Sequence, residues 1–119
     1  MDTVGQRDEL YVADCRIRAT AELFAHTWDV VVLAALRERA LRRRDLRREI
    51  GGVSDKVLTE ALHRLLRRGL VDRTTTPEAP PRVDYALTEI GRSLVDGPIL
   101  AMGRWATEHA DHLAGIRPD

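Results

Sequence analysis

The sequence has little cysteine, few aromatic side chains and no long apolar run. Among its 119 residues Cys15 is the sole cysteine, and 4% of the residues are aromatic. One cysteine cannot form a disulfide within the chain, which excludes a disulfide-stapled secreted fold and favours a reducing compartment. The longest uncharged apolar run, 30–36, is too short to cross a bilayer, and the polar stretch 1–9 does not resemble a signal peptide. We therefore expect a cytoplasmic protein without a membrane partner.

The chain also lacks net charge, but its charges are unevenly distributed. Residues 37–73 contain 12 basic against 6 acidic side chains, whereas the remainder contains 7 against 13. A basic middle between acidic ends focuses positive potential on one region, as a phosphate-facing surface requires. A GC-rich genome would explain why 18 of the 19 basic residues are arginine, but it would not explain the clustering.

Motifs for catalysis or cofactor binding are absent. No nucleophile stands beside a base, and Gly51-Gly52 lacks the pattern of a phosphate-binding loop. His109 and His112 have a spacing at which a dimer could hold a metal, although such pairs are more often solvated or packed. We expect neither an enzyme nor a resident metal or cofactor.

An amphipathic helix is predicted between residues 53 and 69. Ser54 is suited to the N-cap, Asp55 places a negative charge in the first turn, and Gly69 ends the helix. Apolar residues recur at spacings of three and four, at Val57, Leu58, Ala61, Leu62, Leu65 and Leu66. The other face carries Asp55, Lys56, Thr59, Glu60, His63, Arg64 and Arg67. This polar face suits an ordinary solvated surface or the reading of base edges in a major groove.

A second helix is predicted just ahead, over residues 40–50, with Leu46 and Ile50 facing inward. Two glycines then break the chain, so the two helices form a helix-turn-helix in which the first crosses the DNA backbone and the second enters the groove. The first helix carries arginines at 42, 43, 44, 47 and 48. Of these, Arg43, Arg44 and Arg47 are the candidates for phosphate contacts.

Behind the helix-turn-helix the apolar period changes from helical to alternating. Residues 70–76 and 82–87 read as two strands, and the intervening PEAPP cannot continue either of them. A hairpin in this place is the wing of a winged helix, with Arg82 near its tip.

The flanking segments are predicted to be helical. We expect helices over residues 11–25, from an N-cap at Thr27, from Thr88 and Glu89, and over 99–113 after a break or bend at Gly97-Pro98. The apolar stripe of the last helix exceeds what a small core needs, and its usual partner is the same helix of a second chain. The predicted fold is mainly α with a small β-hairpin (α+β). It comprises an arm over 1–10 and one winged helix-turn-helix domain over 11–119, with terminal dimerisation helices.

These segments, from Cys15 to Trp105, resemble the HxlR-type winged-helix transcriptional regulators, relatives of the MarR-like group. The most specific part is PEAPPRVDYALTEIGRSL, residues 77–94, which joins the wing to a Thr-x-x-Gly helix start. The resemblance implies a bacterial homodimer that binds a pseudo-palindromic operator in double-stranded DNA, with its recognition helices in successive major grooves. It also implies DNA contacts at Ser54, Lys56, Thr59 and Arg82. We add Asp55, Glu60 and His63 from the polar helix face.

The sequence departs from that family pattern at three places. Arg16 follows Cys15 where the family usually has proline, and Ala25 to Trp28 replaces Gly-Gly-Lys-Trp. Arg43 stands where an apolar or aromatic residue is common. The first two departures concern the region that senses signals in the family.

Two sensing sites and one rival function follow. Several HxlR-like proteins sense oxidants, quinones or aldehydes through a cysteine near the position of Cys15, and Arg16 and Arg18 would favour its reactive thiolate. Alternatively, Cys15 is a small buried apolar residue. A small apolar effector could instead bind a pocket between helices, formed by Phe24, Trp28, Trp105 and Tyr11, although core is the default role of such residues. The rival function is a winged helix that serves as a protein-interaction adaptor.

Overall fold

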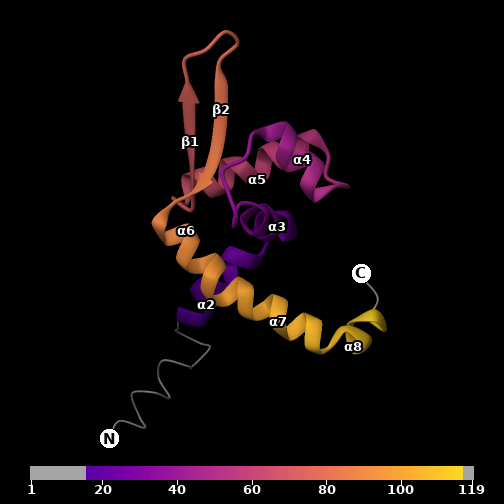
Figure 1. The fold of residues 1–119 in the computed structure, drawn as a ribbon. Coiled ribbons are helices and arrows are strands. Elements are labelled where there is room, and N and C mark those ends of the chain that lie inside the picture. Colours follow the sequence, from indigo (N-terminus) through magenta and orange to yellow (C-terminus); the bar gives the residue numbers. More distant parts are fainter. Residues whose placement is uncertain (1–15, 117–119) are drawn as a thin grey trace, which may run out of the picture.

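The computed structural model describes residues 16–116, which form a body of helices and one two-stranded hairpin that projects from it (Figure 1). The elements in chain order are α2 (Arg16–Ala21), the 3-10 helix η2 (Glu22–Phe24), α3 (Thr27–Ala35), α4 (Arg43–Ile50), α5 (Asp55–Arg67), β1 (Val71–Thr76), β2 (Arg82–Leu87), α6 (Glu89–Leu94), the π-helix η3 (Val95–Ile99), α7 (Leu100–Glu108) and α8 (Ala110–Ala114). This order confirms the predicted fold class, a mainly α winged helix-turn-helix. The predicted arm over 1–10, Tyr11 and Cys15 lie outside the described residues.

The helix-turn-helix forms where the sequence predicts it. Gly51 and Gly52 have φ angles of 70° and 69°, a backbone conformation that residues with a Cβ atom rarely adopt. The tight turn between α4 and α5 therefore requires glycine at these positions. The Ser54 hydroxyl caps α5 by accepting a hydrogen bond from the Val57 amide at 3.1 Å. At the other end Gly69, with φ of 71°, donates to Leu66, and the Leu70 amide donates to Leu65. Both ends of α5 are therefore closed by local hydrogen bonds.

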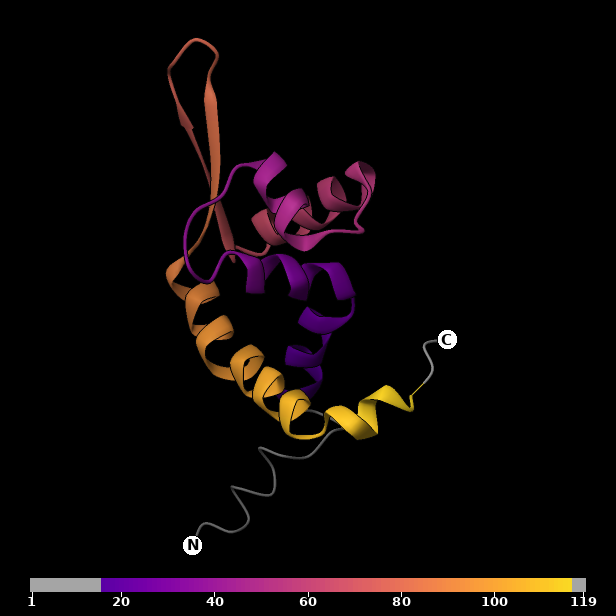
Figure 2. The same ribbon diagram turned by 45° about the vertical axis from the view of Figure 1, so that its right-hand side comes forward.

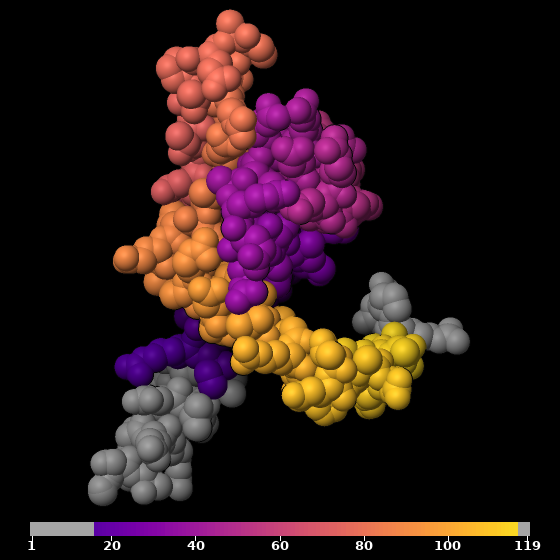
Figure 3. Space-filling view, viewed as in Figure 1, coloured from indigo at the N-terminus to yellow at the C-terminus, as the bar shows by residue number. Residues whose placement is uncertain are grey.

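The wing is an antiparallel hairpin whose register runs from Val71 opposite Leu87 to Thr76 opposite Arg82. It projects from the helical body in both ribbon views (Figures 1 and 2), and in the space-filling view its tip stands clear of the helices (Figure 3). Leu41 forms a β-bridge with Tyr85 through two backbone hydrogen bonds of 2.9 and 2.8 Å. The prediction of a helix from residue 40 was therefore wrong at its start. The backbone groups of Leu41 pair with the wing, and α4 begins at Arg43.

One apolar core holds the helices together. Its centre is α5, which packs against α3 on one side, with α4 and the base of the wing around them. The buried apolar residues are Val32, Leu33, Leu36, Leu41, Leu46, Val53, Leu58, Ala61, Leu62, Leu65, Leu70, Val71, Val95 and Ile99. Within the predicted stripe of α5, Val57 and Leu66 are half-buried at its margins. This core sets the orientation of α5, and with it the direction in which its polar face points.

The C-terminal helices form an arm that leaves the base of the wing and passes below α3 (Figures 1 and 2). α6 begins where a helix was predicted, and Thr88 caps it by accepting a hydrogen bond from the Gly91 amide at 3.0 Å. The predicted break or bend at Gly97-Pro98 is an irregular helical segment and not a helix end. The chain passes through it as the π-helix η3, which has helical dihedral angles at both caps and accommodates Pro98. The predicted single helix over 99–113 is instead interrupted at His109, whose φ and ψ of −118° and 30° are not helical.

The N-terminal helices also differ from the prediction in their limits. The described part of the segment 11–25 is the six-residue α2, which is followed by a 3-10 turn rather than by further α-helix. α3 begins with Thr27 already inside the helix. Its N-cap is His26, whose side chain makes no capping hydrogen bond, so the prediction of Thr27 as the cap was wrong by one residue. Neither difference changes the core, because α3 still buries Val32 and Leu33.

Candidate nucleic-acid interface

The first turn of α5 is bound to α4 by one arginine. Arg43 donates through Nη2 to the Asp55 carbonyl oxygen at 2.8 Å and to Asp55 Oδ1 at 3.0 Å. It also donates through Nε to Oδ1 at 3.3 Å and through Nη2 to the Thr59 hydroxyl. The Thr59 hydroxyl in turn donates to the Asp55 carbonyl at 2.9 Å. Three predicted DNA-contacting residues, Arg43, Asp55 and Thr59, are thus joined in one network at the start of α5.

The remaining arginines of α4 also lie close to aspartates, either Asp55 or Asp45. Arg47 Nη1 is 3.7 Å from Asp55 Oδ1. Arg44 Nε and Arg48 Nη1 are 4.0 and 3.7 Å from Asp45 Oδ1, and both arginines are exposed. Exposed pairs at such distances contribute little to stability. The guanidinium groups therefore remain available to other anions at the surface.

Lys56, Glu60 and His63 project from the exposed face of α5. The three lie at spacings of four and three, so they share one side of the helix. None of them makes a hydrogen bond or an ion pair with another residue in the range 16–116. Ser54 is also exposed, but its hydroxyl is occupied by the Val57 amide. Lys56, Glu60 and His63 therefore form the part of the predicted interface that is free to meet another molecule.

Arg64 does not belong to this exposed face, which corrects the sequence interpretation. Its guanidinium points into the protein and binds the carboxylate of Asp29 on α3, with Nε to Oδ2 at 2.9 Å and Nη2 to Oδ1 at 2.8 Å. Asp29 is 0% exposed, and Arg68 Nη1 lies 3.8 Å from its Oδ2. Hydrogen bonds to Asp29 raise the pKa of Arg64 above its ordinary value, so the guanidinium stays charged. The pair fixes α5 against α3 rather than reading DNA.

The wing carries one predicted contact residue, Arg82, and a cation that the sequence interpretation missed. Arg82 Nε lies 3.1 Å from Asp84 Oδ2, because residues two apart on a strand share a face. Arg73 of β1 lies opposite Tyr85 of β2. Its side chain is exposed and makes no ion pair with any residue that the structure describes. The sequence signal for this difference was the Arg-x-Asp spacing in β2. It gives Arg82 an acidic partner two residues away, whereas Arg73 has no such partner in β1.

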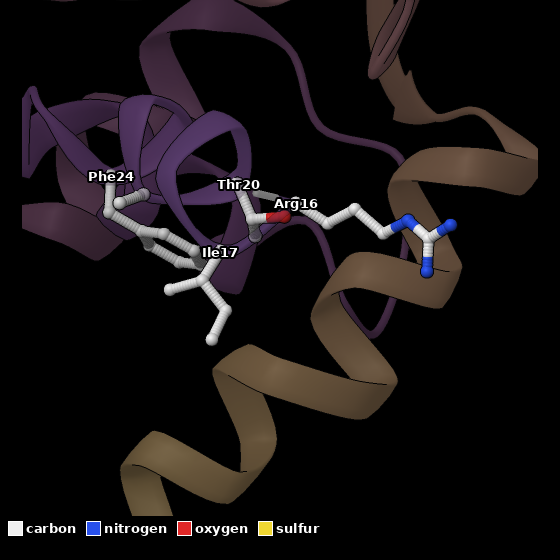
Figure 4. Close-up of a pocket in the computed structure, with 5 residues that line it drawn as sticks. Arg16, Ile17, Thr20 and Phe24 are labelled. Atoms are coloured by element: carbon white, nitrogen blue, oxygen red, sulfur yellow. The ribbon is translucent and has the colours of Figure 1, made fainter. Parts of the chain in front are cut away.

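The described residues of the predicted aromatic pocket have different surroundings within one chain. Phe24 lines an open cavity of about 330 Å³ with Arg16, Ile17, Thr20 and Ala21. Figure 4 shows Phe24 and Ile17 side by side, with Arg16 extending in another direction. Trp28 is half-buried against the core, and Tyr11 lies outside the described residues.

Trp105 lies on α7 and is 52% exposed. Its ring stacks on His109, with centroids 4.4 Å apart, and His109 Nδ1 lies 2.9 Å from the Trp105 carbonyl oxygen. Local contacts thus occupy one nitrogen of the histidine pair considered for metal binding. Over residues 16–116, no group of three potential metal ligands occurs, and no helix is long and apolar enough to cross a membrane.

Comparison with known proteins places this geometry among regulators. Residues 23–114 match the family described as HxlR-like helix-turn-helix. The chain is 34% identical over 110 residues to the uncharacterized HTH-type transcriptional regulator YtfH of Escherichia coli strain K12, covering 92% of this chain and 86% of YtfH. It is also similar to the redox regulator HypR in its reduced form, with a TM-score of 0.77 and 27% identity over 84% of this chain and 98% of HypR. The reduced transcriptional regulator YodB from B. subtilis has a TM-score of 0.69 and 28% identity, covering 76% of this chain and 88% of YodB.

Proposed function

The chain belongs to the HxlR-like helix-turn-helix family of transcriptional regulators, and on this premise we propose that it binds a pseudo-palindromic DNA operator as a homodimer. The observation that carries the proposal is the face of α5 formed by Lys56, Glu60 and His63, which is exposed and unpaired among the described residues. Exposed arginines lie on α4 and on the wing, and the phosphate contacts that they make would hold this face of α5 against base edges. Ser54 would contribute by closing the first turn.

Lys56→Ala is expected to weaken operator binding by roughly 5- to 100-fold, the effect of losing one base or groove contact. Thermal stability should stay unchanged, because the Lys56 side chain is exposed and makes no hydrogen bond or ion pair with another described residue. Thr59→Ala would be a poorer test, since the Thr59 hydroxyl also binds Arg43 and the Asp55 carbonyl. The measurement is a gel shift with the DNA upstream of the chain's own coding sequence.

Arg67→Ala is the matched control. Arg67 is an exposed cation near the other end of α5 and has no partner among residues 16–116. Arg67→Ala should cost less affinity than Lys56→Ala, since it removes the same charge at the opposite end of the same helix face, eleven residues from Lys56. Equal losses for the two variants would contradict a contact specific to Lys56. Absence of any shift with the wild-type protein would favour the protein-interaction adaptor.

The homodimer is supported by apolar side chains that remain exposed on the terminal helices. Ile17 on α2 is 45% exposed, and Met102 and Trp105 on α7 are 50% and 52% exposed. Large apolar side chains gathered on protruding helices are typical of a surface that a second chain covers. We assign the dimer interface to α2, α7 and α8, and the partner to a second copy of this chain.

The regulator is proposed to respond to electrophiles through Cys15. The similarity to HypR, a redox regulator solved in reduced and oxidized forms, supports this assignment. Cys15→Ser is expected to abolish the change in operator binding that a quinone or diamide causes in the wild-type protein, because the serine hydroxyl is not a comparable nucleophile. Gel shifts with and without the electrophile provide the measurement. An unchanged response in Cys15→Ser would remove Cys15 from the mechanism and favour an effector site near Phe24, Trp28 or Trp105.

A further inference from the structure

Asp55 places a negative charge at the start of the recognition helix, on the surface where DNA phosphates are proposed to bind. Its side chain is 66% exposed, and its Oδ1 atom lies 3.0 Å from Arg43 Nη2 and 3.7 Å from Arg47 Nη1. These two arginines lie four residues apart, so they share one side of α4. A single carboxylate oxygen thus holds two guanidinium groups on the side of α4 that faces α5.

The arrangement does not consume all the binding capacity of Arg43. Its Nε and Nη2 atoms donate to α5, whereas Nη1 has no hydrogen-bond partner among residues 16–116. The Arg43 side chain is 33% exposed and that of Arg47 is 49% exposed. Both groups can therefore still reach a phosphate, but the attraction is reduced by a carboxylate that already lies beside them.

The contacts of Asp55 differ from those of a residue that reads bases. A carboxylate selects a base by accepting a hydrogen bond from the cytosine amino group. Here the Oδ1 atom of Asp55 is already shared by Arg43 and Arg47. Its exposed location also brings a negative charge close to any phosphate that binds these arginines. Repulsion of that kind weakens phosphate contacts, which supply essentially all of the affinity for a duplex without the operator. On an operator, base contacts fix the protein in one register, in which the phosphates can lie at the free edges of the arginines and away from Asp55.

We infer that Asp55 is a specificity-determining counter-charge, which restrains Arg43 and Arg47 and so suppresses binding to non-operator DNA. The inference rests on the proposed function, because it requires that α4 and α5 meet DNA. Arg43 is then a positioning residue for the first turn of α5, and it contacts phosphate only through its free edge. Asp45 on α4 is likewise shared by two arginines, since its Oδ1 atom lies 4.0 Å from Arg44 Nε and 3.7 Å from Arg48 Nη1.

The test compares Asp55→Asn with the wild-type protein on a labelled random-sequence duplex, by fluorescence anisotropy over a series of salt concentrations. Asp55→Asn is expected to raise affinity for this duplex roughly 3- to 10-fold at low salt. The slope of log affinity against log salt concentration should also become steeper, by the amount that about one to two additional phosphate contacts produce, because Arg43 and Arg47 are released. Affinity for the upstream DNA should rise less, so the ratio of specific to random binding should fall. The substitution leaves the Ser54 cap in place, and circular dichroism checks that each variant is folded.

Two control variants separate this effect from net charge and from helix capping. Asp96→Asn makes the same chemical change in an exposed aspartate that pairs with Arg37 at 3.3 Å, away from α4 and α5. Asp55→Glu keeps the charge in place. Both are expected to bind random DNA like the wild type. Two results would overturn the counter-charge while leaving the proposed function intact. One is an equal gain in affinity for random DNA in Asp55→Asn and Asp96→Asn, and the other is an unchanged ratio of upstream-DNA to random-DNA affinity in Asp55→Asn. If the wild type binds neither duplex, both proposals fail.

Discussion

Arg64→Met is expected to lower the free energy of unfolding by about 3–5 kcal/mol, the typical effect of removing one partner from a buried ion pair. The reason is the asymmetry of the pair. Asp29 is 0% exposed, whereas the side chain of Arg64 is 19% exposed. Without Arg64 the carboxylate stays in the core between α3 and α5, and Arg68 at 3.8 Å compensates for it only partly. Chemical denaturation at neutral pH measures the loss.

Three further variants test that explanation. Arg67→Met, on the exposed face of the same helix, is expected to change stability by less than about 0.5 kcal/mol. Asp29→Asn should cost less than Arg64→Met, because the guanidinium that it leaves behind can turn toward water. The double variant Asp29→Leu with Arg64→Met should recover much of the loss, since it leaves no uncompensated charge. A similar loss in Arg67→Met would show that the effect is not specific to the buried pair.

The parts of this fold that could be predicted from sequence are those determined by neighbours along the chain. The ends of α5 depend on Ser54 and Gly69, each of which acts within a few residues. The wing likewise follows from strand alternation on either side of a proline-rich loop. In the candidate interface, the exposure of Lys56, Glu60 and His63 follows from the helical period, and the structure places all three on the exposed face.

The features that could not be predicted depend on contacts between distant segments. Arg64 and Asp29 are 35 residues apart, and their spacing gives no sign that they meet. The bridge from Leu41 to Tyr85 joins segments that local propensity cannot relate, so residue 41 was predicted to be helical. The network of Arg43 with Asp55 and Thr59 depends on the crossing of α4 over α5, which only the packed core determines. For this reason the sequence shows which side chains are polar but not which of them are already paired.

The junction between wing and C-terminal arm also depends on such a contact, at Gly91 in α6. Thr88 donates to the Gly69 carbonyl at 2.7 Å, and its amide donates to the Leu70 carbonyl at 3.1 Å. These bonds draw the first turn of α6 onto the end of α5. A Cβ atom at position 91 would overlap the carbonyl oxygen of Leu70 and lie 3.0 Å from its carbonyl carbon. The Thr-x-x-Gly pattern therefore has a physical basis in which threonine makes the joint and glycine leaves room for it.

Gly91→Ala is accordingly expected to destabilise the protein by about 3 kcal/mol, since the obstacle is backbone and cannot move as a side chain would. In an unobstructed helix the same change is favourable by up to about 1 kcal/mol, because alanine has the higher helix propensity. Gly103→Ala in α7 provides that comparison, since a Cβ there meets nothing within 4 Å. Thermal melts should thus move in opposite directions for the two variants, and a stabilised Gly91→Ala would show that α6 does not pack this closely on Leu70. Because α6 leads into the arm that carries Trp105, Gly91→Ala is also expected to weaken the homodimer, which sedimentation velocity would measure.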